Sequence, residues 1–237
     1  MCHLSVNINK LATIRNARGG DNPDLIRWAE MIQSYGAQGI TIHPRPDERH
    51  IRRSDVVELK EVVHTEFNIE GFPSEDFMEM VLRIQPEQVT LVPDPPHVLT
   101  SNAGWDVISR HGELKPVIDR LREAGIRSSI FMDTDLEQMV ALSQVKPDRV
   151  ELYTQDYAEG YAKDREAARA PYVEAAKLAK EMGMGVNAGH DLDLSNLRYL
   201  YEGIPFLEEV SIGHALICDA LLYGMDNTVK LYLRELR

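Results

Sequence analysis

The sequence predicts one (β/α)8 barrel domain with extra short helices, covering residues 1–237. Eight short apolar runs rich in β-branched residues alternate with longer amphipathic runs, which is typical of parallel strands joined by crossover helices. A length of 237 residues suits an α/β barrel built as a single domain. Polar side chains also recur near the ends of the apolar runs, and that end of a barrel is where this fold carries its functional residues.

The strands and helices are expected in alternation along the chain. The strands are expected at residues 4–9, 39–43, 67–70, 88–92, 127–133, 149–153, 184–189 and 208–213. The helices are expected at residues 23–35, 54–64, 74–84, 114–123, 136–145 and 167–182. Several helices begin at a capping residue, as at Ser54 and Ser74, or stop at a glycine, as at Gly125 and Gly183. Eight such units close naturally into a barrel.

An open, doubly wound sheet is the alternative arrangement of these elements. That fold usually shows a glycine-rich turn after its first strand, and here the strand leads into Asn9 and Lys10 without one. The barrel is therefore favoured. The longest irregular connections, residues 103–112 and 153–163, are candidate active-site loops or short extra helices. The last helix, residues 221–236, is apolar and aromatic enough to suggest a packing surface.

The composition is that of an ordinary globular protein with an acidic balance. Hydrophobic residues make up 43% and charged residues 27%, and the formal net charge is −12. This charge argues against non-specific binding to nucleic acid or to anionic membranes. The two cysteines, Cys2 and Cys218, are too few for a disulfide framework or a paired-cysteine metal site. No signal peptide or membrane-length apolar run is recognisable, so a cytoplasmic protein is expected.

Five of the predicted strands carry polar side chains where a parallel barrel is expected to be apolar. Nearly all of them lie in the last residues of a strand or just after it: Asn7, Asn9, Thr41, His43, Asn68, Glu70, Glu151, Tyr153, Asn187 and His190. Burying one such group without a partner costs about 2 kcal/mol or more. Each residue alone has an ordinary structural explanation, such as a turn or a salt bridge. The whole set at one end of the barrel predicts a functional site.

Two Gly-His pairs and a group of arginines predict phosphate binding at that site. Gly189-His190 and Gly213-His214 follow the last two strands, where this fold usually holds a phosphate. Glycine lets the backbone approach a ligand, and the start of a helix favours an anion. Guanidinium groups match phosphate oxygens well, and arginines follow the first two strands at Arg15, Arg18 and within residues 43–53. Tight turns and a solvated charged surface are the alternative explanations.

The opening segment, VNINKLATIRNARG at residues 6–19, closely resembles the opening motif of the pyridoxine 5'-phosphate synthase family, PdxJ. Five further segments agree with that family in order and spacing: GITIH at 39–43 through RHI at 49–51, NIE at 68–70, LVP at 91–93, VNAGH at 186–190 and IGHA at 212–215. The resemblance spans essentially the whole chain. It implies a (β/α)8 barrel with extra helices, usually assembled as a homo-octamer built from dimers.

The resemblance also implies a reaction. In this family, 1-deoxy-D-xylulose 5-phosphate condenses with 3-amino-2-oxopropyl phosphate to give pyridoxine 5'-phosphate, inorganic phosphate and water, without a metal or an organic cofactor. The family's proton acceptors fall on His43 and Glu70, its proton donor on His190, and its transition-state stabiliser on Glu151. The 3-amino-2-oxopropyl phosphate site corresponds to Asn7, Arg18, Asp191, Gly213 and His214. The 1-deoxy-D-xylulose 5-phosphate site corresponds to Asn9, Lys10, Arg45, His50 and Thr100.

The chain departs from the family pattern at two places near the site. Many members have Asp-His where this chain has Asn9-Lys10, and many have glycine where it has Asp191. A carboxylate beside a phosphate is unfavourable unless it turns away. Asp191 is therefore expected to serve the phosphate site through its backbone N–H.

Two other functions fit the same residues. A metal-dependent hydrolase of this fold would use His43, Glu70, His190 and His214 as ligands, since imidazole and carboxylate suit zinc or iron. The sequence lacks a His-x-His on its first strand and a His-Glu-x-x-His helix, which weakens this alternative. A non-catalytic barrel that binds a phosphorylated metabolite would bind its ligand tightly without turnover. The number of titratable groups at one end argues against that function.

Overall fold

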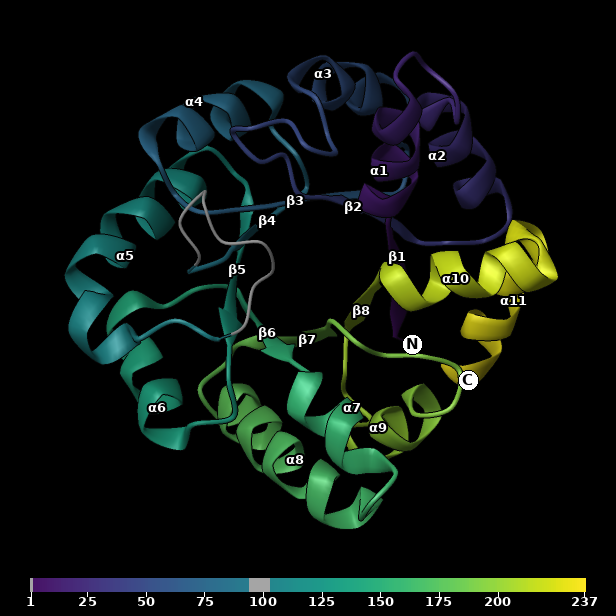
Figure 1. The fold of residues 1–237 in the computed structure, drawn as a ribbon. Helices are drawn as coiled ribbons and strands as arrows, with labels where there is room; N and C mark the ends of the chain where they lie inside the picture. The colour runs from purple at the N-terminus through teal and green to yellow at the C-terminus, as the bar shows by residue number, and fades with distance from the viewer. Residues whose placement is uncertain (1, 94–102) are drawn as a thin grey trace.

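The chain folds into a closed barrel of parallel strands with helices around it (Figure 1). The computed structural model describes residues 2–93 and 103–237, and the eight strands in these ranges pair in chain order until β8 closes on β1. They are β1 (His3–Asn7), β2 (Gly39–Ile42), β3 (Glu66–Gly71), β4 (Gln88–Leu91), β5 (Arg127–Met132), β6 (Arg149–Tyr153), β7 (Gly185–Gly189) and β8 (Glu209–Ile212). All lie at the predicted positions, within two residues, and the closure excludes the open sheet.

Eleven helices are found in the same described ranges. They are α1 (Asn9–Arg18), α2 (Leu25–Ser34), α3 (Arg53–Val62), α4 (Glu75–Ile84), α5 (Val107–Glu123), α6 (Leu136–Val145), α7 (Gln155–Tyr161), α8 (Arg165–Glu181), α9 (Leu197–Gly203), α10 (His214–Tyr223) and α11 (Met225–Glu235). The six predicted helices correspond to α2, α3, α4, α5, α6 and α8. The short helix α7 lies in the expected connection 153–163, whereas α1 and α9 do not follow from the hydrophobic pattern.

Two predicted segments differ from the structure. The connection 103–112 is irregular only in its first part, because the Asp106 side chain caps α5 by accepting a hydrogen bond from the Ser109 N–H at 3.2 Å. The predicted helix 221–236 is interrupted at Gly224, so that α10 ends and α11 begins there. Gly224 has φ +77°, a left-handed conformation that glycine adopts without strain and that ends a helix.

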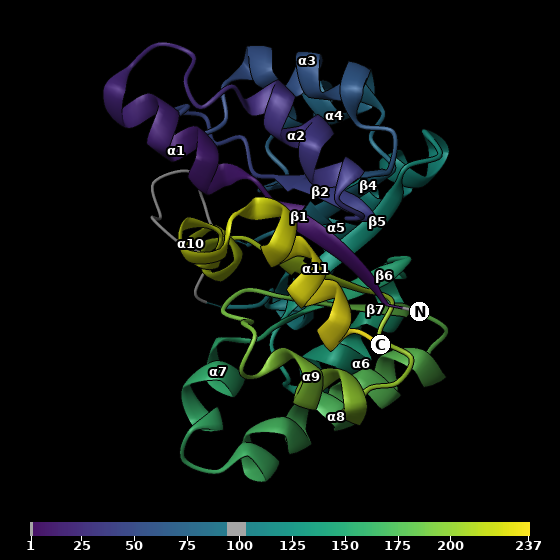
Figure 2. The same ribbon diagram turned by 90° about the vertical axis from the view of Figure 1, so that its right-hand side faces the viewer.

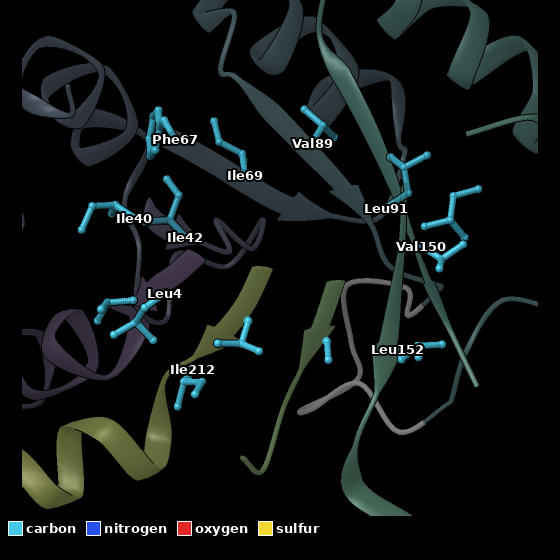
Figure 3. Close-up of a cluster of buried hydrophobic side chains, with 14 of the residues drawn as sticks. Leu4, Ile40, Ile42, Phe67, Ile69, Val89, Leu91, Val150, Leu152 and Ile212 are labelled. Carbon is cyan, nitrogen blue, oxygen red and sulfur yellow. The ribbon is translucent and has the colours of Figure 1, made fainter. Parts of the chain in front are cut away.

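Side chains on the strands alternate between the outside of the barrel and its lumen. The outward side chains are apolar and fully or almost fully buried under the helices, as Figure 3 shows for Leu4, Ile40, Ile42, Phe67, Ile69, Val89, Leu91, Val150, Leu152 and Ile212. Burying apolar surface contributes about 25 cal/mol per Å². This shell between strands and helices is therefore the main hydrophobic core, and it leaves the lumen available for other residues.

The lumen is polar through the middle of the barrel. The Ser5 and Thr41 hydroxyls are 2.7 Å apart, and Asn68 Nδ2 donates to Thr41 Oγ1 at 3.3 Å. Thr90 Oγ1 lies 3.1 Å from Asn68 Oδ1 and 3.3 Å from a carboxyl oxygen of Glu151. Thr41 and Asn68 therefore belong to a buried network inside the barrel. The prediction that they belong to a functional site at its carboxyl end is wrong, because both side chains are fully buried within this network.

Two arginines meet acidic and amide side chains at the amino-terminal end of the lumen. Arg127 pairs with Glu66, and Arg149 Nη2 lies 2.7 Å from Glu208 Oε2. Arg149 Nη1 also donates to Asn187 Oδ1 at 3.1 Å. Asn187 was expected in a site at the carboxyl end, and this prediction is wrong, because its side chain is buried and bonds to Arg149 at the other end of the lumen.

The two ends of the barrel differ in what surrounds them. Figure 2 shows α1, α7 and α10 on the side where β1 ends, with both chain termini toward the opposite side. The loops and short helices thus gather at the carboxyl ends of the strands, where functional residues of this fold lie. Within residues 2–93 and 103–237, none of the helices has the length and apolar character that crossing a membrane requires.

Candidate active site

A cavity of about 620 Å³ opens at the carboxyl ends of the strands. In the described part of the chain it is lined by Asn7, Asn9, Lys10, Thr13, His43, Arg45, Arg49, His50, Glu70, Val92, Phe131, Glu151, His190, Asp191, Leu192, Ser211, Ile212, Gly213, His214 and Ala215. All the residues that the family resemblance assigns to the site, except Arg18 and Thr100, are among them. The strand-end and loop positions that the sequence singles out are thus brought together at one mouth.

Glu70 lies near the end of β3, and its largely buried side chain, 13% exposed, makes long polar contacts with Asn7 and His43. Asn7 Nδ2 donates to Glu70 Oε2 at 3.4 Å, and His43 Nδ1 lies 3.7 Å from the same oxygen. Burial raises the pKa of Glu70 to about 7, although the charge of Arg45 and a hydrogen bond with Ser211 act in the opposite direction. A carboxyl group in this state exchanges its proton near neutral pH, which suits a general base.

Glu151 is the second buried carboxyl group of the mouth. Burial and the nearby charge of Glu70 raise the pKa of Glu151 to about 8, against a hydrogen bond from Thr90 and the charge of His190. The Thr90 hydroxyl lies 3.3 Å from Glu151 Oε2. A β-carbon on Gly189 would stand 2.2 Å from Glu151 Oε1. The glycine before His190 therefore makes room for this carboxyl group, a reason beyond the tight turn expected there.

His43 follows β2 and is held by two asparagines of the opening motif. The His43 backbone N–H donates to Asn9 Oδ1 at 2.9 Å, and the Asn9 N–H donates to Asn7 Oδ1 at 3.1 Å. Burial, with the charges of Arg45, His50 and Arg49, lowers the pKa of His43 well below its usual value. The ring is therefore neutral at pH 7 and able to accept a proton.

Asn9 differs from its predicted place in the first strand. It is the first residue of α1, so the prediction that Asn7 and Asn9 share one strand face is wrong. The chain turns into the helix at Ile8, whose φ and ψ of −92° and 9° lie outside the β region. This turn lets Asn9 reach across to the backbone of His43.

A basic group lines the side of the cavity formed by the loop after β2. Arg45, Arg49 and His50 come from this loop, and Lys10 comes from the first turn of α1. Burial and the charges of Arg49 and Arg45, with a further contribution from Lys10, lower the pKa of His50 to about 4, against the charge of Asp47. The mouth therefore combines neutral imidazole rings with fixed positive charge, an environment that attracts phosphate.

Two predicted residues and one further arginine lie elsewhere. Arg18 is the exposed last residue of α1, and Thr100 lies outside the described residues. Arg15 is buried and donates from Nη1 and Nη2 to the two carboxylate oxygens of Asp55 at 2.7 and 2.8 Å. Its Nη2 also donates to the His50 carbonyl at 3.1 Å. Arg15 therefore stabilises the loop at the cavity wall, and its prediction as a phosphate ligand is wrong.

The start of α10 forms another wall. Gly213 precedes the helix, and a β-carbon there would lie 3.1 Å from the Asn7 β-carbon. His214 is the first residue of α10, so backbone N–H groups without helical partners face this part of the mouth. Such groups bind anions. The expected phosphate position after the last strand is thus compatible with the geometry.

Several lining residues escape prediction from the sequence alone. Ser211 lines the cavity and hydrogen-bonds to Glu70, yet it resembles an ordinary strand serine. Its position near the end of β8, two residues before the Gly213-His214 pair, is the signal that would have found it. Arg49 lies in the arginine-rich segment but was not singled out. Val92 and Phe131 supply apolar wall and give no sequence signal of a site.

Among residues 2–93 and 103–237, no group of three or more histidine, cysteine, aspartate or glutamate side chains is arranged to hold a metal ion. His43, Glu70, His190 and His214 all line the cavity. They do not converge on one point in the way that the hydrolase alternative requires.

The chain matches known proteins over its whole length. The family model described as "Pyridoxal phosphate biosynthesis protein PdxJ" matches residues 4–237. A pyridoxine 5'-phosphate synthase of Cytophaga hutchinsonii is 58% identical over 237 residues, with 100% of both chains covered. Another, from Parabacteroides distasonis, is 56% identical over 232 residues, which cover 98% of each chain.

Solved structures with low sequence identity share the fold. A phosphoribosylanthranilate isomerase from Thermotoga maritima has a TM-score of 0.60 at 12% identity, covering 100% of this chain and 98% of that one. A tryptophan synthase from M. tuberculosis in an aminoacrylate-bound form has a TM-score of 0.67 at 10% identity, covering 100% and 94%. At these identities the likeness establishes the barrel architecture alone.

Proposed function

The chain belongs to the PdxJ family of pyridoxal phosphate biosynthesis proteins, and we propose that the mouth of its barrel is where it makes pyridoxine 5'-phosphate. It is an enzyme of vitamin B6 biosynthesis. The observation that carries the proposal is the pair of buried carboxyl groups, Glu70 and Glu151, whose pKa values are raised to about 7 and about 8. They share one cavity with His43 and His190.

The proposed substrates are 1-deoxy-D-xylulose 5-phosphate and 3-amino-2-oxopropyl phosphate. The amine of the second attacks the ketone of the first, and the resulting carbinolamine loses its hydroxyl group as water, so an imine forms without an enzyme lysine. The remaining steps are proton transfers, eliminations and a ring closure that release inorganic phosphate and water. Such steps need several acid–base groups that exchange protons near neutral pH, and the cavity supplies them.

Glu70 and His43 are the proposed proton acceptors. With a pKa of about 7, Glu70 is partly ionised at neutral pH and removes a carbon-bound proton from the imine. His43 is neutral, because burial and Arg45 lower its pKa, and it assists ring closure as a base. The 3.7 Å between His43 Nδ1 and Glu70 Oε2 lets the two groups serve neighbouring atoms of one intermediate.

His190 and Glu151 are the proposed groups on the donor side. His190 protonates a leaving oxygen. Glu151 is mostly protonated at neutral pH, because its pKa is raised to about 8, so it donates a hydrogen bond to developing negative charge. The Thr90 hydroxyl holds its other oxygen at 3.3 Å.

The two phosphate groups are assigned to opposite walls of the cavity. The 3-amino-2-oxopropyl phosphate lies at the start of α10, where Asn7, Gly213 and His214 meet. The phosphate of the sugar lies against the basic wall of Lys10, Arg45 and His50. Asn9 lines the cavity as well, and its Oδ1 accepts a hydrogen bond from the His43 backbone N–H, so it also positions His43. Arg18 and Thr100 remain predicted ligands on the family resemblance alone.

The test is to mix purified protein with both substrates and follow product by absorbance and mass spectrometry. Wild type is expected to form pyridoxine 5'-phosphate, and Glu70→Gln to lose about 10³-fold in kcat, since a positioned general base contributes 10²- to 10⁴-fold. Glu66→Gln is the matched control, because Glu66 lies on the same face of β3 at the other end of the lumen. The control should stay active.

Three results would contradict the proposal. Well-folded wild type without product would remove the synthase function and leave the hydrolase or the non-catalytic barrel. Equal losses in Glu70→Gln and Glu66→Gln would show that the carboxyl group at the mouth has no special role. Activity that is lost on dialysis against a chelator and restored by zinc or iron would favour the hydrolase chemistry, because the proposed reaction uses neither metal nor organic cofactor.

Assembly and location are proposed on the family resemblance. A homo-octamer built from dimers is supported by Leu221 and Leu222 on α10, each 77% exposed, and by the exposed Tyr223 beside them. A cytoplasmic location is supported by Cys2 and Cys218, which are free thiols. Sedimentation velocity of the purified protein tests the assembly, and a monomer at micromolar concentration would contradict it.

A further inference from the structure

His190 makes its shortest side-chain contact with the next residue in the chain. The Asp191 carboxylate oxygen Oδ2 lies 2.6 Å from His190 Nδ1, and both side chains line the cavity. We propose that Asp191 is a positioning residue, which holds the His190 ring with its proton on Nδ1 and leaves Nε2 to exchange a proton with substrate. This inference rests on the proposed role of His190 in the synthase reaction.

The backbone on both sides of this pair is fixed by buried side chains. Thr154 Oγ1 donates to the Gly189 carbonyl at 2.8 Å and also to the His190 carbonyl. Asn196 Nδ2 donates to the Asp191 carbonyl at 3.2 Å. The turn is therefore anchored before and after the two residues, so the carboxylate and the imidazole meet in one defined geometry.

Both residues of the pair have left-handed backbone conformations. His190 has φ +77° and Asp191 has φ +49°, a region that costs a non-glycine residue about 1 kcal/mol or more. Glycine, which many members of the family have at the position of Asp191, would avoid this strain. A side chain kept at a position that favours glycine points to a use for the carboxylate.

The carboxylate completes a set of contacts that fixes the ring. The Tyr153 ring stands edge-on to His190, with 5.0 Å between the ring centroids and 77° between the planes. The hydrogen bond from His190 lowers the pKa of Asp191, and the charges of His190 and His214 add to that effect. Asp191 is thus an ionised acceptor at neutral pH. Its pairing with Nδ1 also explains how a carboxylate is tolerated beside a phosphate site, since it is directed to the imidazole.

The kinetic test compares Asp191→Gly and Asp191→Asn with wild type. Asp191→Gly is expected to lower kcat about tenfold, a fraction of what a general acid contributes, with KM for both substrates nearly unchanged. Its melting temperature should not fall, because glycine is favoured at this φ. Asp191→Asn keeps an oxygen acceptor for Nδ1–H and should recover part of the loss. Asp156→Asn is the control, because it removes the same charge from an exposed position on α7, after β6.

A double-variant experiment tests whether Asp191 acts through His190. In a His190→Gln background, Asp191→Gly should cause no further loss of kcat, since the group that it positions is already gone. Multiplied losses in the double variant would overturn the proposal. So would an unchanged kcat in Asp191→Gly, or a KM for 3-amino-2-oxopropyl phosphate that changes while kcat does not.

A spectroscopic readout separates this inference from the synthase assignment. In protein with ¹⁵N-labelled histidine, the His190 signals are those lost in His190→Gln. They should report a proton on Nδ1 in wild type and a shift toward the Nε2–H tautomer in Asp191→Gly. Identical tautomers in the two proteins would overturn the positioning role. Absence of synthase activity with the expected tautomer change would contradict only the proposed function.

Discussion

Each end of the barrel lumen holds a pair of carboxyl groups, and the two pairs differ in how far nearby cations and hydrogen bonds compensate them. At the amino-terminal end, Glu66 and Glu209 lie with Arg127 and Arg149. At the carboxyl end, Glu70 and Glu151 share a cavity with neutral imidazole. Glu66 and Glu70 even lie on the same face of β3. The two glutamates are only four residues apart in the sequence and differ in their surroundings, so the surroundings decide in which direction the pKa of the carboxyl group shifts.

At the amino-terminal end the charges are compensated. Burial, together with a hydrogen bond to Glu66 and the charge of Glu66, raises the pKa of Glu209 well above its usual value. Burial alone would raise the pKa of Glu66, but the hydrogen bond from Glu209 and the pairing with Arg127 bring it below the usual value. Gln88 Nε2 donates to Glu209 Oε1 at 3.3 Å. The two pKa values are thus shifted in opposite directions, which favours a negative charge on Glu66, beside Arg127, over one on Glu209.

At the carboxyl end the compensation is incomplete. The charge of Arg45 and a hydrogen bond with Ser211 oppose the effect of burial on Glu70, and its pKa still rises to about 7. Glu151 is raised further, to about 8, by burial and by Glu70 itself. Two carboxyl groups that titrate near neutral pH are the kind of group that acid–base chemistry needs. A buried carboxyl group whose charge is only partly compensated by cations and hydrogen bonds is therefore able to exchange its proton near neutral pH.

The largest effect is expected from breaking the compensated end. Arg149→Met should lower the free energy of unfolding by about 3 kcal/mol, because Glu208 and Glu209 lose the guanidinium group that lies 2.7 and 3.8 Å from their carboxyl oxygens, and the buried Asn187 Oδ1 loses a donor. kcat at 25 °C should stay near that of wild type, since Arg149 lies at the end of the lumen away from the cavity. Urea denaturation and steady-state kinetics measure the two quantities.

Arg120→Met is the matched control for that variant. Arg120 pairs with Glu75 on the surface at 2.8 Å, and exposed ion pairs contribute only about 0 to 1 kcal/mol. A loss in Arg149→Met no greater than in Arg120→Met would show that the inner network does not stabilise the barrel. A large loss of kcat in folded Arg149→Met would contradict the inference that the amino-terminal end of the lumen serves stability and not catalysis.

A second comparison uses two glycines of β7. A β-carbon on Gly189 would stand 2.2 Å from Glu151 Oε1, whereas one on Gly185 would stand 2.6 Å from Glu208 Oε1. Glu208 is about half exposed and can turn away, but Glu151 is buried. Gly189→Ala should therefore displace Glu151 and lower kcat about 30-fold, within the range for a misplaced catalytic group.

Gly185→Ala should leave kcat within a factor of about two, since the side chains that must move, the flexible end of Glu208 and the Cγ of Arg149, lie at the end of the lumen away from the cavity. Kinetics on both variants, with circular dichroism to verify folding, decide the comparison. Equal kcat values for Gly189→Ala and wild type would mean that the position of Glu151 is unimportant for the reaction.

The carboxyl end of the barrel was more predictable from the sequence than the amino-terminal end. His43, Glu70 and His190 lie at the ends of apolar runs and within motifs, so position and motif agree. Glu66 and Arg127 begin their strands and resemble ordinary surface residues in the sequence. Their network joins residues far apart in the chain, such as Gln88 and Glu209, which are 121 residues apart. A local pattern carries no signal of such pairs.

Local structure around the opening motif was also hard to predict. Helix α1 begins without a side-chain cap, and its first residues, Asn9 and Lys10, are polar like a loop. The sequence therefore predicts a longer strand, and the contact of Asn9 with the His43 backbone becomes visible only when β1 and β2 lie side by side. The 2.6 Å contact between His190 and Asp191 was missed for another reason. Adjacent residues rarely face each other, and here the two left-handed conformations bring them together.

The sharpest test of the carboxyl end concerns the pH dependence of Glu151→Gln. In wild type, kcat/KM should fall about tenfold per pH unit below pH 7, as Glu70 takes up a proton, and above pH 8, as Glu151 loses one. A glutamine at position 151 still donates a hydrogen bond. The variant should lose only about tenfold in kcat/KM at pH 7, and its alkaline fall should disappear.

The free energy of unfolding should also depend on pH through Glu151. Because the pKa of Glu151 is raised from its ordinary 4.5 to about 8 in the folded protein, its protonated form favours folding below about pH 4.5. That contribution is lost as the pH rises toward 8. Glu151→Gln lacks this loss, so its free energy of unfolding should gain on that of wild type between pH 5 and pH 8 and then stay level. Urea denaturation at several pH values measures the gain. A constant difference between the two proteins would mean that Glu151 titrates normally, and the contrast between the two ends of the lumen would then have to rest on Glu70 alone.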